Sequence, residues 1–222
     1  MSLLRRFTFA KQSDVVSAAW LAHFGGTFLD VDSLMITDGA TTFLNTRQEL
    51  DAFVYYGDSR TDGVHIGALS ASKRSSVATL WLDGAIDKMQ NWEDDRSWAY
   101  LGNSILEPLI KAPENDGLSR RIDVRQSLAT PELLLEEEYP QLDRQGLYER
   151  FWFSPDNFRS YSVDWKECSG IVSLHNSWTP LSFLGLRGQG LEDADNRLCQ
   201  LLREYGDRSA IKELEAKFYY GS

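Results

Sequence analysis

Apolar side chains recur at three- and four-residue spacing in several segments of the chain, a pattern typical of helices with one buried face. The first such segment begins at Ser13 and ends at Gly25–Gly26, a glycine pair that favours a helix stop. Its periodic positions are Val16, Ala19, Trp20 and His23–Phe24. The same pattern predicts further helices over 73–90, 103–111, 191–205 and 209–220, the last two closing the chain.

Short β-branched and apolar runs between these segments predict strands over 27–36, 52–56, 64–69, 151–153 and 170–175. The run 133–135 fits a strand or a helix, and the polar stretch 112–125, with proline and glycine, predicts a loop. Helices that alternate with short buried strands predict an α/β domain, with a mixed sheet flanked by helices.

Composition narrows the class of protein. A length of 222 residues favours a single domain over 1–222. The 23 basic and 33 acidic residues give a net charge of −10, which makes nucleic acid an improbable partner. No apolar run approaches the ~20 residues needed to span a bilayer, and none resembles a signal peptide. Cys168 and Cys199 cannot form a disulfide framework. We expect a cytoplasmic protein without a transmembrane segment, with peripheral attachment to the inner membrane face left open.

Two aspartates, Asp30 and Asp32, lie in the middle of the predicted strand 27–36. Residues at i and i+2 of a strand project to one face, where two like charges repel unless a cation lies between them. Oxygen ligands suit Mg²⁺ or Mn²⁺, and such a cation can bridge to a substrate diphosphate. The pair alone favours a solvated strand end over a metal site, because Asp193 and Asp195 have the same spacing in a polar segment.

The longer block Ser13–Asp14, helix, Gly25–Gly26, aromatic, Asp30-x-Asp32 resembles the sugar-binding DXD block of GT-A glycosyltransferases. It is most similar to the capsular-polysaccharide and mannosyl- or galactosyltransferase group, and covers residues 13–36. A second segment, 174–178 (Leu-His-Asn-Ser-Trp), is similar to that group's C-terminal element. Weaker similarities lie at 64–69, 100–106 and 151–158, so that the resemblance spans Ser13 to about Leu186.

The resemblance implies a GT-A fold. It also implies metal-dependent transfer of a sugar from a UDP- or GDP-sugar donor to a glycan acceptor in polysaccharide synthesis, with retention of the anomeric configuration. The implied cofactor is Mn²⁺ or Mg²⁺. Its implied ligands are Asp30, Asp32, His175 and Asn176. The implied donor contacts are Asp14, Asp30, Ser177 and Trp178. Asp62 and His65 are candidates for contact with the acceptor, and no catalytic residue is assigned.

Two departures from the family pattern point to an alternative. The group usually carries arginine where this chain has Ser17. A GT-A domain also opens with a strand-helix-strand unit that binds the nucleotide base, whereas twelve residues precede Ser13 here. The alternative is therefore a catalytically incomplete GT-A-like protein that binds a glycan or a partner; a metal-dependent phosphohydrolase is a third, weaker reading. We expect an uncovered sheet edge, and with it a homo-oligomer or an N-terminal partner.

Overall fold

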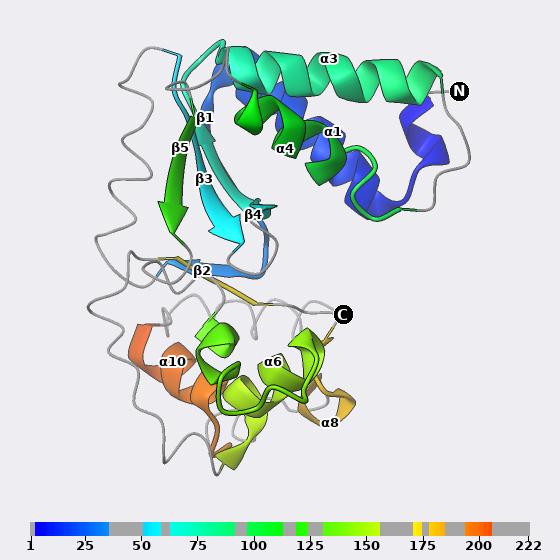
Figure 1. Ribbon diagram of the computed structural model, residues 1–222. Helices are drawn as coiled ribbons and strands as arrows, with labels where there is room; N and C mark the ends of the chain where they lie inside the picture. Colours follow the sequence, from blue (N-terminus) through cyan, green and yellow to red (C-terminus); the bar gives the residue numbers. More distant parts are fainter. Residues whose placement is uncertain are drawn as a thin grey trace, which may run out of the picture. The chain divides into compact units, whose positions relative to one another are not determined.

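The structure is a computed structural model that describes residues 3–35, 51–58, 63–91, 97–112, 119–123, 131–155, 171–174, 178–184 and 194–205 (Figure 1). The chain forms two compact units. The first comprises residues 1–129 and 165–174, and the second comprises 130–164 and 175–222. Two compact units can belong to one domain, so the single domain over 1–222 stays a prediction.

The first unit contains a four-stranded sheet in the order β1-β4-β3-β5. Its strands are β1 (Gly26–Leu29), β4 (Gly63–Ala71), β3 (Phe53–Asp58) and β5 (Ser119–Asp123). β4 pairs antiparallel with both β1 and β3, whereas β5 runs parallel to β3. A second, two-stranded sheet pairs β2 (Ser33–Met35) with β6 (Ile171–Ser173) in antiparallel fashion. The mixed α/β character expected from the sequence is thus confirmed.

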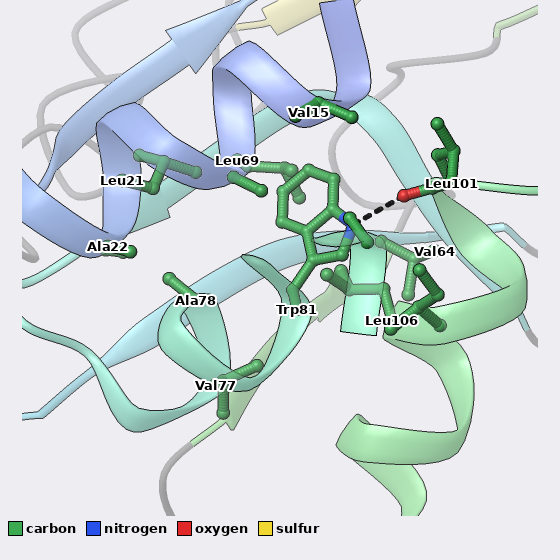
Figure 2. Close-up of a cluster of buried hydrophobic side chains, with 14 of the residues drawn as sticks. Val15, Leu21, Ala22, Val64, Leu69, Val77, Ala78, Trp81, Leu101 and Leu106 are labelled. Atoms are coloured by element: carbon green, nitrogen blue, oxygen red, sulfur yellow. Dashed lines mark hydrogen bonds between the residues drawn. The ribbon is translucent and has the colours of Figure 1, made fainter. Parts of the chain in front are cut away.

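Helices lie beside this sheet in the first unit (Figure 1). They are η1 (Leu3–Arg6), α1 (Phe9–Phe24), α3 (Ser76–Gln90) and α4 (Asn103–Lys111). Helix α1 packs against α3 and β1, and α4 packs against α3 and β4. The fully buried Trp81 sits at the centre of their core, where its indole Nε1 donates a hydrogen bond to the carbonyl of Leu101 at 2.8 Å (Figure 2). Apolar side chains from α1, α3, α4 and β4 surround the ring, so one residue ties these elements together.

The second unit is helical in its described part. It contains η4 (Pro131–Leu135), α6 (Arg144–Phe153), α8 (Leu181–Leu184) and α10 (Arg197–Tyr205). Asp143 caps α6 by accepting a hydrogen bond from the backbone of Gly146 at 2.8 Å. One side of α6 is buried against η4 and α10. The buried side chains of this helix are Leu147, Tyr148, Phe151 and Trp152.

Several sequence predictions are confirmed. Helices α1, α3 and α4 occupy the segments predicted at 13–24, 73–90 and 103–111, although α1 begins at Phe9. Strands β3, β4 and β6 match the runs 52–56, 64–69 and 170–175. The undecided run 133–135 lies in the 3-10 helix η4. Of the predicted helix 191–205, the described part is helical from Arg197 onward, and the predicted helix 209–220 lies outside the described residues.

Other predictions are wrong, each for a physical reason. The run 151–153 is the end of α6, because the aromatic residues that suggested a strand continue the helical spacing of Leu147 and Tyr148. The predicted loop 112–125 contains β5, whose polar sequence is held by parallel pairing to β3. The predicted strand 27–36 is divided into β1 and β2, which belong to different sheets. The division falls at Asp30–Asp32.

Candidate functional site

Asp30 and Asp32 lie in a tight turn between β1 and β2, rather than within one strand. The backbone N–H of Ser33 donates to the carbonyl of Asp30 at 2.9 Å, and the N–H of Asp30 donates to the carbonyl of Gly67 at 2.8 Å. Aspartate favours turns, and this pair therefore ends β1 as soon as its pairing with β4 is complete. The prediction that the two carboxylates project from one strand face is wrong, because the backbone between them turns.

The turn holds the carboxylate of Asp30 against β4, beside His65. A Cβ built on Gly67 would lie 2.8 Å from Asp30 Oδ2 and 3.2 Å from His65 Nε2. Both polar groups therefore approach the same glycine, which leaves them the space that any other residue would fill. The structure thus brings Asp30, an implied contact of donor and metal, close to His65, a candidate contact of the acceptor.

Asp14 comes to the same region from α1. Its Oδ2 would lie 2.8 Å from a Cβ built on Gly102, the residue before α4. Burial, and then the charge of Asp30, raise the pKa of Asp14 from its ordinary value of 3.8 to about 7, against the opposing effect of Lys11. The electrostatic interaction between Asp14 and Asp30 places both in one acidic site, which we call the Asp14–Asp30–His65 cluster.

Lys11 is the cation that acts on this cluster. It lies one helical turn before Asp14, is buried, and places Nζ 5.3 Å from the ring centroid of Tyr100. Ser17, where the resemblance leads one to expect arginine, is also buried and donates its hydroxyl to the carbonyl of Ser13 at 2.7 Å. The positive charge that α1 places near Asp14 therefore comes from Lys11, one helical turn earlier.

Asp30 and Asp32 offer carboxylate oxygens, the ligand type that a hard divalent cation prefers. The charge of Asp30 also adds to the effect of burial in raising the pKa of Asp14. Within the ranges that the structure describes, no group of three His, Cys, Asp or Glu side chains is arranged to hold a metal ion. The other two implied ligands, His175 and Asn176, lie outside these ranges, as do Ser177 and Asp62.

The second sheet joins the strand that follows Asp32 to the strand that ends just before Leu174. β2 and β6 pair with Ser33 opposite Ser173 and Leu34 opposite Val172. The pairing is extended by a hydrogen bond from the N–H of Leu174 to the carbonyl of Asp32 at 2.8 Å. The residue directly before His175 is therefore bonded to the second aspartate of the Asp-x-Asp pair.

Trp178 belongs to the second unit, where it is half-buried among aromatic and charged side chains. Its ring centroid lies 5.7 Å from that of Tyr148, and the guanidinium carbon of Arg144 lies 5.8 Å from it on the ring face. Arg144 also places Nε 3.9 Å from a carboxylate oxygen of the fully buried Glu132. The indole thus has a cationic neighbour in its own unit.

Sequence reasoning missed Lys11, Gly67, Gly102 and Arg144 as parts of these sites. For Gly67 a signal existed, since a glycine inside a strand often marks a close approach of another group. For Lys11 a signal also existed, since residues three apart on a helix are neighbours. For Arg144 the sequence offers none, because Glu132 and Trp178 are distant from it along the chain.

Comparison with family models, with curated proteins and with solved structures finds no match to this chain. Among the helices in the described ranges, none combines the length and the apolar character needed to cross a membrane. The function is therefore inferred from the chemistry of the chain's own residues.

Proposed function

We propose that this chain is the sugar- and metal-binding portion of a GT-A glycosyltransferase. It transfers a sugar, with retention, from a UDP- or GDP-sugar to a glycan acceptor in polysaccharide synthesis. The observation that carries the proposal is the hydrogen bond from Leu174 to Asp32. This bond and the β2–β6 pairing link the second aspartate of one of the two similar segments to Leu174, the first residue of the other.

The chain's residues divide the work of donor binding. Asp32 would ligate the cation directly, and Asp30 would hold it through water and contact the donor. Mn²⁺ or Mg²⁺, when bound, supplies positive charge to the leaving diphosphate. His175 and Asn176 complete the ligand set, while Ser177 and the indole N–H of Trp178 donate hydrogen bonds to phosphate oxygens.

Asp14 and His65 orient the sugars. The carboxyl group of Asp14, whose pKa burial and the charge of Asp30 raise above its ordinary value, binds a hydroxyl of the donor sugar. His65 lies beside Gly67, as Asp30 does, and contacts the acceptor together with Asp62. Lys11 moderates the negative charge of this cluster.

The test is cleavage and transfer of nucleotide-sugars by the purified chain, with Mn²⁺ and with EDTA. We expect turnover to require the cation and to be lost in the double variant Asp30→Asn/Asp32→Asn. The matched control is Asp193→Asn/Asp195→Asn, which removes a pair of aspartates with the same spacing. Turnover that survives both chelation and the Asp30/Asp32 replacement contradicts the metal assignment.

A second candidate is a catalytically incomplete GT-A-like protein that binds a glycan or a partner. The buried Ser17 favours it, because the position where the resemblance expects a donor-binding arginine offers a hydroxyl that already bonds Ser13. Calorimetric titration separates the two candidates. Cation-dependent binding of UDP- or GDP-sugars without any turnover favours the second candidate, and turnover excludes it.

A further inference from the structure

Helix α1 is apolar on two opposite faces. One face packs into the core of the first unit through Val15, Ala18, Leu21 and Ala22. The opposite face carries large apolar side chains that are exposed to solvent: Phe9 (88%), Val16 (55%), Trp20 (58%) and Phe24 (63%). The rings of Trp20 and Phe24 lie 4.9 Å apart, so they form one continuous patch.

The exposed residues form a stripe along the whole helix. At 100° per residue, positions 9, 13, 16, 20 and 24 fall within an arc of about 80°, and His23 widens it to about 100°. No Lys, Arg, Asp or Glu lies on this arc. A surface helix normally carries its charged residues on the solvent-facing side. A contiguous apolar stripe on that side marks a binding surface. We call it the α1 stripe.

Basic side chains lie at both ends of the α1 stripe. Arg5 and Arg6 are exposed in η1, directly before the helix. Lys73 and Arg74 are exposed at the other end, where a Cβ on Gly25 would meet the backbone of Lys73. These cations flank an uncharged stripe in a chain whose net charge is −10. The local surface is therefore complementary to an anionic partner, although the whole chain is acidic.

A second copy of the chain does not suit this arrangement. In a symmetric contact, the same patch on each copy faces the other. With the helices antiparallel, Arg5 and Arg6 of one copy would approach the Lys73 and Arg74 of the other; with the helices parallel, each pair would approach its own counterpart. Both arrangements bring like charges together.

We propose that the α1 stripe docks on an anionic lipid bilayer surface. Aromatic side chains on one helix face, with basic residues beside them, are the combination by which amphipathic helices lie in the interface plane. The rings of Phe9, Trp20 and Phe24 enter the boundary between headgroups and acyl chains, and the flanking cations contact anionic headgroups. Asp14 lies toward the opposite, packed side of α1, so docking leaves the Asp14–Asp30–His65 cluster uncovered.

The test is flotation of the full chain with vesicles, measured with and without added salt, and needs no enzymatic activity. Vesicles of phosphatidylcholine mixed with phosphatidylglycerol should bind the chain, and vesicles of phosphatidylcholine alone should bind it far more weakly. Each basic residue near an anionic surface contributes about fivefold to partitioning, so Arg5→Gln/Arg6→Gln should weaken it about 25-fold. Trp20→Ser/Phe24→Ser should weaken it about a hundredfold, because burying half of each exposed ring contributes about tenfold.

The matched control is Leu80→Ser, which removes a 42%-exposed apolar residue from α3 and should leave partitioning unchanged. Circular dichroism checks that the exposed-site variants stay folded. An absence of binding to the anionic vesicles overturns the proposal, as does equal binding to both vesicle types or an equal loss in Leu80→Ser. Self-association that Trp20→Ser/Phe24→Ser abolishes, seen by light scattering in the absence of lipid, also overturns it and assigns the stripe to a second copy.

Discussion

Replacing Asp14 by asparagine keeps the shape of the side chain and removes its charge. Burial and the nearby charge of Asp30 raise the pKa of Asp14 from 3.8 to about 7. The folded chain therefore holds the Asp14 proton more tightly than the unfolded chain does. This contribution to stability is complete below about pH 4, and is lost as the pH rises to about 7.

The magnitude follows from the size of the shift. About three pKa units, at about 1.4 kcal/mol each, give about 4 kcal/mol of stability lost across this window. Asparagine cannot release a proton, so the Asp14→Asn variant lacks this loss. We expect it to be more stable than the original chain above about pH 7, and of similar stability near pH 4.

Urea unfolding followed by circular dichroism, in EDTA, at pH values across this window measures the effect. Asp83→Asn, which neutralises an exposed aspartate of α3, is the matched control and should unfold with the pH dependence of the original chain. Asp30→Asn should reduce the slope in part, because the charge of Asp30 is the second cause of the shift. Parallel pH profiles for the original chain and Asp14→Asn would refute the reasoning.

Three further replacements test the geometry. Gly67→Ala should abolish cation-dependent turnover, because the added Cβ would meet the Asp30 carboxylate at 2.8 Å and displace it, and should lower the free energy of unfolding in urea by only about 1 kcal/mol. Full turnover in this variant would contradict the placement of Asp30. Trp81→Phe should lower the free energy of unfolding in urea by about 2–4 kcal/mol, because the smaller ring fills less of the core and the carbonyl of Leu101 loses its hydrogen bond from the indole. A cost under about 1 kcal/mol would contradict the central role of the ring. Asp51→Ala should cost about 1–2 kcal/mol in thermal or urea unfolding, because its carboxylate accepts hydrogen bonds from the first residue of α3; an unchanged midpoint would show that this cap is dispensable.

The sequence predicted those elements in which local pattern and tertiary packing agree. The helix at 103–111 and the strand at 64–69 are examples, since each buries apolar residues in the core. Helix α1 was found, but the prediction of its buried face was wrong. The periodic positions Val16, Trp20 and Phe24 are exposed, and the other apolar face packs into the core instead. The run Phe151–Phe153 misled for a related reason: aromatic residues favour strands by composition, and only packing against η4 and α10 shows them to be helical.

The candidate site was predictable in its residues and not in its geometry. Motif similarity picked out Asp14, Asp30 and His65, which the structure brings together. The turn at Asp30 escaped notice because apolar residues lie on both sides of it. It depends on a hydrogen bond to Gly67, a partner on another strand. Lys11 lies three residues before Asp14, a helical spacing that predicts their closeness. Its burial, by contrast, could not be predicted from the sequence.

The placement of β6 also fixes an order of events during synthesis. Residues 165–174 belong to the first unit, although they follow 130–164 of the second. On the ribosome, the sheet β1-β4-β3-β5 can form once β5 has emerged. Strand β2 cannot pair until β6 has been synthesised, after the whole intervening stretch of the chain. Closing so long a loop also delays the contact during refolding. The Asp14–Asp30–His65 cluster is thus an early product of folding, and the backbone link from Asp32 to Leu174 is a late one.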